Sequence, residues 1–203
     1  MSPAYPQMHQ TPTISTAYAR LLFDYLRALG RNPASILPAA QVAEIETNHS
    51  HALTSRAAWL EMIASITAQS DDPDLALKIG EAFQVRHLGV AGYVLISCAT
   101  LGEAGQQVVR YYRLMGDVGS SQVHRCGEWA EDIFQWSEAG SPPPVLEQLW
   151  AAATVTLGRW LTGRNDLAWE AHFRFPRPSD ISAYERIFHG TLRFGQPATK
   201  LVF

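Results

Sequence analysis

Residues 89–117 read GVAGYVLISCATLGEAGQQVVRYYRLMGD, and the rest of the predicted fold can be placed around this stretch. Thr100 and Glu103 have the T-x-x-E spacing of a capping box, which predicts a helix that begins at Leu101. Glycine inside a helix costs about 1 kcal/mol relative to alanine, so Gly105 predicts a close neighbour. The apolar side of this helix has the spacing of a core-facing helix, and it consists of Leu101, Ala104, Val108, Tyr112 and Met115.

The chain before this stretch is expected to be helical. Residues 1–14 are rich in proline and polar residues without a period, which predicts a flexible tail followed by one folded domain over residues 15–203. Ser15 is placed to cap a helix that Gly30 ends. The apolar spacing then predicts helices near residues 39–46, over 55–69 and over 72–83.

The chain after this stretch is expected to contain a sheet. Residues 119–126 and 129–137 flank Gly127-Glu128 and predict an antiparallel hairpin. A helix that ends at Gly163 follows over about 145–162, with Trp150 and Trp160 in its inner stripe. Strands at 169–175, 191–194 and 199–203 and a short helix after Asp180 complete the chain. The predicted fold class is α+β: a helical N-terminal half followed by a small antiparallel sheet packed against helices.

Composition excludes several classes of protein. The chain has 203 residues, 47% of them hydrophobic, which is enough for a substantial core. A net charge of −3 argues against direct binding of nucleic acid, which needs a basic face. No apolar run approaches the roughly 20 residues that span a bilayer, so a cytoplasmic location without membrane contact is expected. Cys98 and Cys126 are too few for a disulfide framework and are expected to be buried thiols.

Two features predict that the chain is part of a longer protein. Charged residues make up 17% of the chain, below the roughly 25% of average globular proteins, which predicts surface covered by a partner or another domain. The last residues, Leu201-Val202-Phe203, form an apolar run without a polar cap, as expected of a polypeptide that continues.

A binding pocket for a small molecule needs apolar walls and a few polar groups. The residues expected to bind such a ligand are Tyr112, Trp136, Trp150, His172 and Arg174. If the strand face with His172 and Arg174 turns towards a helix, these two side chains can orient a carboxylate, a phosphate or another polar group. In the alternative interpretation, the three aromatic residues belong to the core, and His172 and Arg174 face water.

The sequence predicts no metal site, no cofactor and no catalytic activity. His49 and His51 are two residues apart in an expected loop near Glu44 and Glu46, but the ligand set is incomplete for a metal. The chain has no nucleophile elbow, Walker loop or dinucleotide-binding glycine motif. An enzyme that uses His172 is the weakest of the functions considered.

Two sets of residues resemble a known family. Residues 89–117 contain, in order, Gly89, Gly92-Tyr93, Ser97, Thr100-Leu101, Glu103-Ala104 and Arg110-Tyr111-Tyr112. The last part of the chain contains Phe173-Arg174-Phe175-Pro176, Tyr184, Phe188, Arg193-Phe194-Gly195 and the final three residues. Both sets are similar to the N-terminal effector-binding domain of AraC-type transcription regulators, in the branch named after arabinose binding. The resemblance extends over about residues 15–203.

The resemblance implies a ligand-sensing and dimerising domain that normally precedes two DNA-binding helix-turn-helix units. The implied partners are a small-molecule effector, a second copy of the chain, and DNA only through a domain that these residues do not contain. A ligand that binds one conformation better than another would then change how the DNA-binding units are presented. The alternative is a stand-alone module that binds a small molecule or a protein and has no role at DNA.

Overall fold

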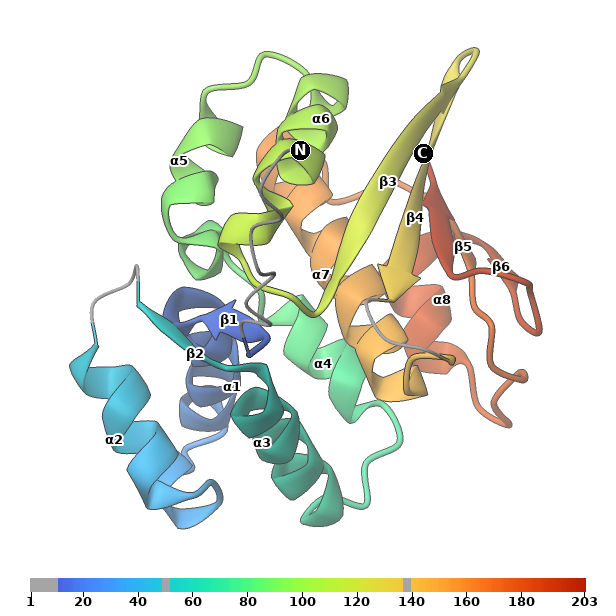
Figure 1. Ribbon diagram of the computed structural model, residues 1–203. Helices are drawn as coiled ribbons and strands as arrows, with labels where there is room; N and C mark the ends of the chain where they lie inside the picture. Colours follow the sequence, from blue (N-terminus) through green and yellow to red (C-terminus); the bar gives the residue numbers. More distant parts are fainter. Residues whose placement is uncertain (1–10, 49–51, 137–139) are drawn as a thin grey trace, which may run out of the picture.

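The computed structural model describes residues 11–48, 52–136 and 140–203 and confirms the α+β class (Figure 1). The helices are α1 (Thr16–Ala28), α2 (Ala39–Thr47), α3 (Arg56–Ala68), α4 (Leu75–Glu81), α5 (Val90–Ile96), α6 (Leu101–Tyr111), α7 (Pro144–Thr162) and α8 (Ser182–Phe188). The strands are β1 (Thr13–Ser15), β2 (Leu53–Ser55), β3 (Gly119–Cys126), β4 (Trp129–Trp136), β5 (Trp169–His172), β6 (His189–Arg193) and β7 (Lys200–Val202). Short 3-10 turns are η1 (Pro33–Ser35), η2 (Val85–Leu88) and η3 (Tyr112–Leu114).

Local capping signals predicted two helix starts correctly. The Ser15 hydroxyl accepts a hydrogen bond from the Tyr18 amide at 3.1 Å, in the first turn of α1. The Thr100 hydroxyl accepts one from the Glu103 amide, also at 3.1 Å, at the start of α6. The Glu103 carboxylate completes the motif one residue earlier than a standard capping box, since it accepts from the Ala99 amide at 2.9 Å.

A short pair of strands joins the beginning of the chain to the helical half. β1 and β2 are antiparallel, with Ile14 opposite Thr54, and Ile14 is fully buried. Thr13 and Ile14, the last two residues of the range expected as a tail, therefore belong to the folded domain; residues 1–10 lie outside the described residues. Strands of three residues are too short to show a period in the sequence, so neither was predicted.

The larger sheet is mixed rather than antiparallel. Its strands lie in the order β3-β4-β7-β5-β6. β3 and β4 form the predicted hairpin, and β7 pairs antiparallel with both β4 and β5. β5 and β6 are parallel, with Trp169 opposite His189, because the connection between them contains helix α8 and carries the chain back. The expectation of antiparallel pairing is wrong for these two strands.

Helix α7 lies between the N-terminal helices and the five-stranded sheet, and it belongs to two hydrophobic cores (Figure 1). Leu149 and Ala153 pack in the core of the N-terminal helices. Trp150 and Val155 pack in the core formed with the sheet and α8. Trp160, which was expected in the inner stripe, is 56% exposed. The two halves of the chain therefore share one helix.

Helix α4 crosses α7 at Gly80. A β-carbon on Gly80 would lie 2.6 Å from the β-carbon of Ala152 and 2.8 Å from the carbonyl oxygen of Leu149. Only a residue without a side chain allows the two backbones to approach this closely. The position of α7 between its two cores therefore depends on this glycine.

The apolar end of the chain is explained by the sheet. β7 lies between β4 and β5, and Leu201 is fully buried there. The apolar run at residues 201–203 thus contains the end of strand β7, and Leu201 packs inside the domain. In the described part of the chain, no helix is both long enough and apolar enough to cross a membrane.

Candidate functional site

A cavity lies between helices α6 and α7, the N-terminal helices and the β3–β4 hairpin. The centre of a water molecule can reach a volume of about 100 Å³ inside it. A cavity needs roughly 10–15 Å³ to hold a single water molecule, so this one has room for a larger, small organic molecule. Ile14 and Phe203, which come from opposite ends of the described chain, both line it.

The apolar face of α6 and η3 forms one wall of the cavity. The five residues predicted to lie on this face, from Leu101 to Met115, all line it. Gly105 lines it as well, and a β-carbon there would meet the Val123 methyl groups at an ordinary distance of 3.7 Å. The predicted face is confirmed, but it borders a hollow. The close neighbour expected at Gly105 is absent among the described residues.

Aromatic rings border the cavity on two sides. On the side of the N-terminal helices, the Tyr18 ring centroid lies 5.7 Å from that of Trp59 and 6.1 Å from that of Phe83. On the other side, Phe134 of β4 stacks on Trp150 of α7 at 5.3 Å. Such rings supply apolar surface, and their negative faces attract cations.

One carboxyl group lines the cavity among these rings. Asp132 of β4 is 5% exposed, and its side chain is hydrogen-bonded to Ser121 of β3. The Asp132 Oδ1 atom has no hydrogen-bond partner among the described residues. Burial raises the pKa of this carboxyl to about 7, against a smaller lowering effect of the Ser121 hydrogen bond. Near neutral pH, Asp132 is therefore present in both protonation states.

Two indole groups at the cavity share this lack of partners. The Nε1 atoms of Trp59 and Trp169 are buried, and no described residue accepts a hydrogen bond from either. Buried polar groups in folded proteins are normally hydrogen-bonded. The cavity is thus lined by residues with two unpaired donors, the Trp59 and Trp169 indoles, and one unpaired acceptor, Asp132 Oδ1. Such groups favour a cavity that binds the polar groups of a ligand.

Of the five residues predicted to bind a ligand, the structure brings two to the cavity. Tyr112 and Trp150 line it. Burial raises the pKa of the Tyr112 phenol, and the charges of Tyr18 and Asp132 raise it further. Trp136, at the end of β4, is partly buried and packs against both cores instead.

His172 and Arg174 are not among the described residues that line the cavity. The His172 Nε2 atom lies 2.7 Å from Glu170 Oε1, and Arg193 donates a hydrogen bond to the same oxygen at 2.6 Å. The Arg174 guanidinium donates to the Ser141 hydroxyl at 2.5 Å. The predicted pocket required the side chains of His172 and Arg174 to lie beside the three aromatic residues. They do not, because alternation along the strand places His172 on the face away from the buried residues.

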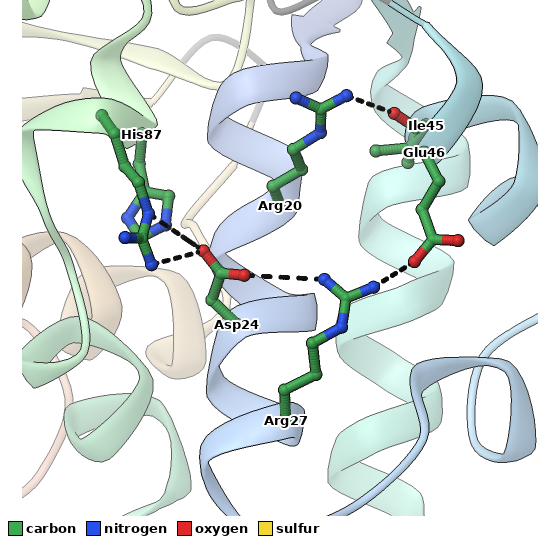
Figure 2. A network of polar contacts seen from close by, with 7 residues as sticks. Arg20, Asp24, Arg27, Ile45, Glu46 and His87 are labelled. Atoms are coloured by element: carbon green, nitrogen blue, oxygen red, sulfur yellow. Dashed lines mark hydrogen bonds and ion pairs between the residues drawn. The ribbon is translucent and has the colours of Figure 1, made fainter.

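A polar network lies behind the Phe83 side of the cavity, and the sequence did not predict it (Figure 2). Asp24 of α1 accepts a hydrogen bond from Arg86 at 2.9 Å and lies 2.9 Å from Nε2 of the buried His87. The His87 Nδ1 atom accepts from the Gln84 amide at 2.9 Å, so the ring proton is on Nε2 and is donated to Asp24. The Phe83 and His87 ring centroids are 5.6 Å apart. The network therefore supports a residue of the cavity wall.

Burial and pairing oppose each other in this network. Burial lowers the pKa of His87 and outweighs the raising effect of Asp24. Burial also opposes ionisation of Asp24, but the hydrogen bonds from His87 and Arg86 hold its pKa below the ordinary value. Arg27 extends the network, because it pairs with Asp24 at 3.7 Å and with Glu46 of α2 (Figure 2). These contacts fix α1 against both η2 and α2.

The remaining candidates from the sequence are a metal site near His49 and His51 and the two cysteines. Among the described residues, no group of three histidine, cysteine, aspartate or glutamate side chains is arranged to hold a metal ion. His49 and His51 lie outside the described residues. Cys98 is partly buried and Cys126 is exposed, so the expectation of buried thiols is wrong for Cys126, which ends β3 next to the hairpin turn.

Comparison with known proteins identifies the family. The model of the arabinose-binding domain of AraC transcription regulators, N-terminal, matches residues 30–203. The chain is 24% identical to the ornithine utilization regulator of Pseudomonas aeruginosa over 185 residues, which are 91% of this chain and 55% of that protein. Its fold is similar to that of the transcriptional regulator CdpR from Pseudomonas aeruginosa, with a TM-score of 0.64 and 20% identity. That match covers 92% of this chain and 54% of CdpR.

The family match covers most of the chain and therefore shows its class, a domain of the AraC transcription regulators. The chain belongs to the family of arabinose-binding domains of AraC transcription regulators, as the resemblance implied. The matched relatives are regulators of transcription, in agreement with the prediction that the chain is not an enzyme. The chain spans about half the length of the relatives that it matches.

Proposed function

We propose that the chain senses a small-molecule effector in the cavity and thereby controls DNA binding by a helix-turn-helix domain of the AraC type. The cavity carries this proposal, because it combines apolar walls with a few unpaired polar groups, as small-molecule sites do. Tyr112 and Trp150 are the proposed ligand contacts that the sequence had indicated. Asp132, Trp59 and Trp169 join them as the residues with unpaired polar atoms.

The proposed mechanism is a shift between conformations. Tyr18 and Trp59 from the N-terminal helices and Phe134 from the sheet line the same cavity, so a bound molecule would contact both halves of the domain. Such a molecule stabilises the arrangement of the two halves that it fits better. It changes DNA binding only to the extent that its affinity differs between arrangements.

We further propose that the domain acts as a homodimer in the cytoplasm and touches DNA only through another domain. Two-fold homodimers are the most common soluble oligomers, and a net charge of −3 gives the chain little attraction for phosphates. Analytical ultracentrifugation of the 203-residue chain is expected to show a dimer. The chain alone is expected not to shift DNA at physiological salt, and tight, salt-sensitive binding would contradict this part of the proposal.

A thermal-shift screen of metabolites tests the sensing role, because a ligand that binds only the folded state raises its apparent stability. Each compound found is then titrated against Gly105→Met. The nearest atoms to a β-carbon at Gly105 are 3.7 Å away, so a longer side chain starts without a clash and extends into the space that Gly105 lines. Gly102→Met is the matched control on the same helix, because Gly102 is exposed.

The expected result is at least about tenfold weaker binding to Gly105→Met and unchanged binding to Gly102→Met, since the added side chain occupies the site. A ligand that binds both variants equally well lies elsewhere, and the cavity would lose its proposed role. In a protein that joins this domain to helix-turn-helix units, the ligand is also expected to change the affinity for DNA. Cavity binding without that change would favour the stand-alone binding module.

A further inference from the structure

The described residues that line the cavity supply one side-chain carboxyl group and no basic group. Among the described residues that line it, none is a lysine, an arginine, a histidine or a glutamate. The phenols of Tyr18 and Tyr112 stay neutral near pH 7, because burial raises both pKa values. Within the described lining, Asp132 is thus the group that carries charge near neutral pH. This part of the cavity wall therefore attracts positive charge, and its described residues supply no cation that would balance a negative charge.

Three kinds of ligand head group can be compared at this wall. A carboxylate would meet the Asp132 charge with no cation among the described lining residues, which is unfavourable in an apolar site. An uncharged apolar group would leave Asp132 Oδ1 unpaired. A protonated amine donates a hydrogen bond, balances the charge and is attracted to the faces of aromatic rings.

We infer that the effector is a mostly apolar molecule with one protonated amine, whose ammonium group donates a hydrogen bond to Asp132. This inference rests on the proposed function, since it names the chemical class of the molecule sensed in the cavity. An uncharged oxygen on the same molecule would accept a hydrogen bond from the Trp59 or Trp169 indole. An apolar cavity of roughly 150 Å³ binds benzene, so a volume of about 100 Å³ favours a small effector whose apolar body is on the order of one ring.

The surroundings of Asp132 determine how this binding depends on pH. Ser121 and Tyr112 are the polar groups that interact with it, and the residues opposite it on the neighbouring strands are Val123 and Leu201. An ammonium group binds the ionised carboxyl. Its affinity therefore rises by up to about tenfold per pH unit below pH 7 and levels off above it. An amine with a pKa near that of lysine, about 10, stays protonated throughout this range.

The test uses three probes that share a phenyl body and differ in their head groups: 2-phenylethylamine, 2-phenylethanol and 3-phenylpropanoate. Calorimetry measures their affinities for the 203-residue chain and for Asp132→Asn at pH 6 and pH 8. Glu131→Gln is the matched control, because Glu131 directly precedes Asp132 in β4 and pairs with Lys200 at 2.6 Å, and it is not among the described residues that line the cavity. Circular dichroism checks that each variant is folded.

At pH 8 the amine is expected to bind at least about tenfold more tightly than the alcohol or the carboxylate, since charge-assisted hydrogen bonds contribute at least this much. The difference in affinity between the amine and the other two probes is expected to be smaller at pH 6. It is expected to disappear in Asp132→Asn and to persist in Glu131→Gln. Equal or tighter binding of another probe, or undiminished binding of the amine to Asp132→Asn, would overturn the inference about the head group. Absence of binding by the amine at millimolar concentration would overturn it too.

These outcomes are separate from the test of the proposed function. If the alcohol or the carboxylate is preferred and loses affinity in Gly105→Met, the cavity is the ligand-binding site and only the inferred ligand class is wrong. If the amine binds with the same affinity to Gly105→Met and to the unmodified chain, the cavity itself is not the site, and both proposals fail.

Discussion

Gly80 of α4 packs directly against Ala152 of α7, with 2.6 Å between the Ala152 β-carbon and the position that a β-carbon on Gly80 would take. The Leu149 carbonyl oxygen and the Ala153 amide nitrogen are also within 3.0 Å of that position. These are backbone atoms of a helix that two cores hold, so they cannot move aside as a flexible side chain can.

Gly80→Ala is therefore expected to destabilise the domain by about 1–3 kcal/mol, as overpacked cores generally do, despite the better helix propensity of alanine. Urea unfolding monitored by circular dichroism measures the effect. Gly102→Ala is the control in an exposed helical position, where the substitution is expected to be neutral or stabilising by up to about 1 kcal/mol. Equal stabilities of the two variants would show that α4 and α7 do not cross this closely.

Asp24→Asn tests the network in Figure 2. The substitution keeps an oxygen acceptor but removes the negative charge that His87 and Arg86 share, so both hydrogen bonds lose their charge assistance, and His87 is only 1% exposed. The expected loss of unfolding free energy is about 1–3 kcal/mol. Glu46→Gln is the matched control, because its ion pair with Arg27 is exposed and such pairs contribute about 0–1 kcal/mol. If both variants unfold at the same urea concentration, His87 does not depend on Asp24.

Asp132→Asn is expected to stabilise the ligand-free domain at pH 8. The pKa of Asp132 is about 7 in the folded state and about 4 in an unfolded chain. Between these values the folded state binds more protons than the unfolded state, so the contribution of Asp132 to stability falls as the pH rises from about 4 to about 7. Asparagine removes this dependence. The stability difference between variant and unmodified chain should grow by up to about 1.4 kcal/mol per pH unit in this window and stay constant above it.

Urea unfolding at half-unit pH intervals measures that difference, and Glu131→Gln provides the reference for loss of a charge on the same strand. A difference that does not change between pH 4 and pH 8 would show that the Asp132 carboxyl is not perturbed by burial.

The two cysteines are expected to react at different rates. Cys126 is exposed at the end of β3, whereas Cys98 is partly buried and its thiol donates a hydrogen bond to the Val94 carbonyl at 3.4 Å. A thiol reagent such as DTNB should therefore modify Cys126 in the folded protein well before Cys98, because access limits the slower reaction. Cys126→Ser removes the fast phase. A fast phase that survives this substitution would contradict the positions of the two thiols.

The sequence predicted the parts of the fold that local chemistry determines. Ser15 and Thr100 were recognised as helix caps, because the cap and its amide partner are three residues apart in the chain. The parallel pairing of β5 with β6 and the pairing of β1 with β2 connect distant segments, and local patterns do not encode such pairing. The exposure of Trp160 was missed for a related reason. A single apolar stripe was assumed for α7. The helix in fact packs in two cores through two different sets of residues, and Trp160 belongs to neither set.

The candidate site was predicted in part. Tyr112 and Trp150 were found because aromatic residues on apolar helix faces are candidates for any pocket wall. Asp132 was missed, although a signal existed: it shares a strand face with Phe134, so a lone acid alternates with apolar residues. His172 and Arg174 were predicted to bind the ligand, but they do not line the cavity. The sequence shows that they lie on the polar face of a strand, and it does not show which part of the molecule that face points to.

Ile14 and Phe203 line the same cavity although they come from the first and last strand regions of the described chain. A molecule inside would contact both of these segments. Its release is therefore expected to be coupled to local unfolding of either one.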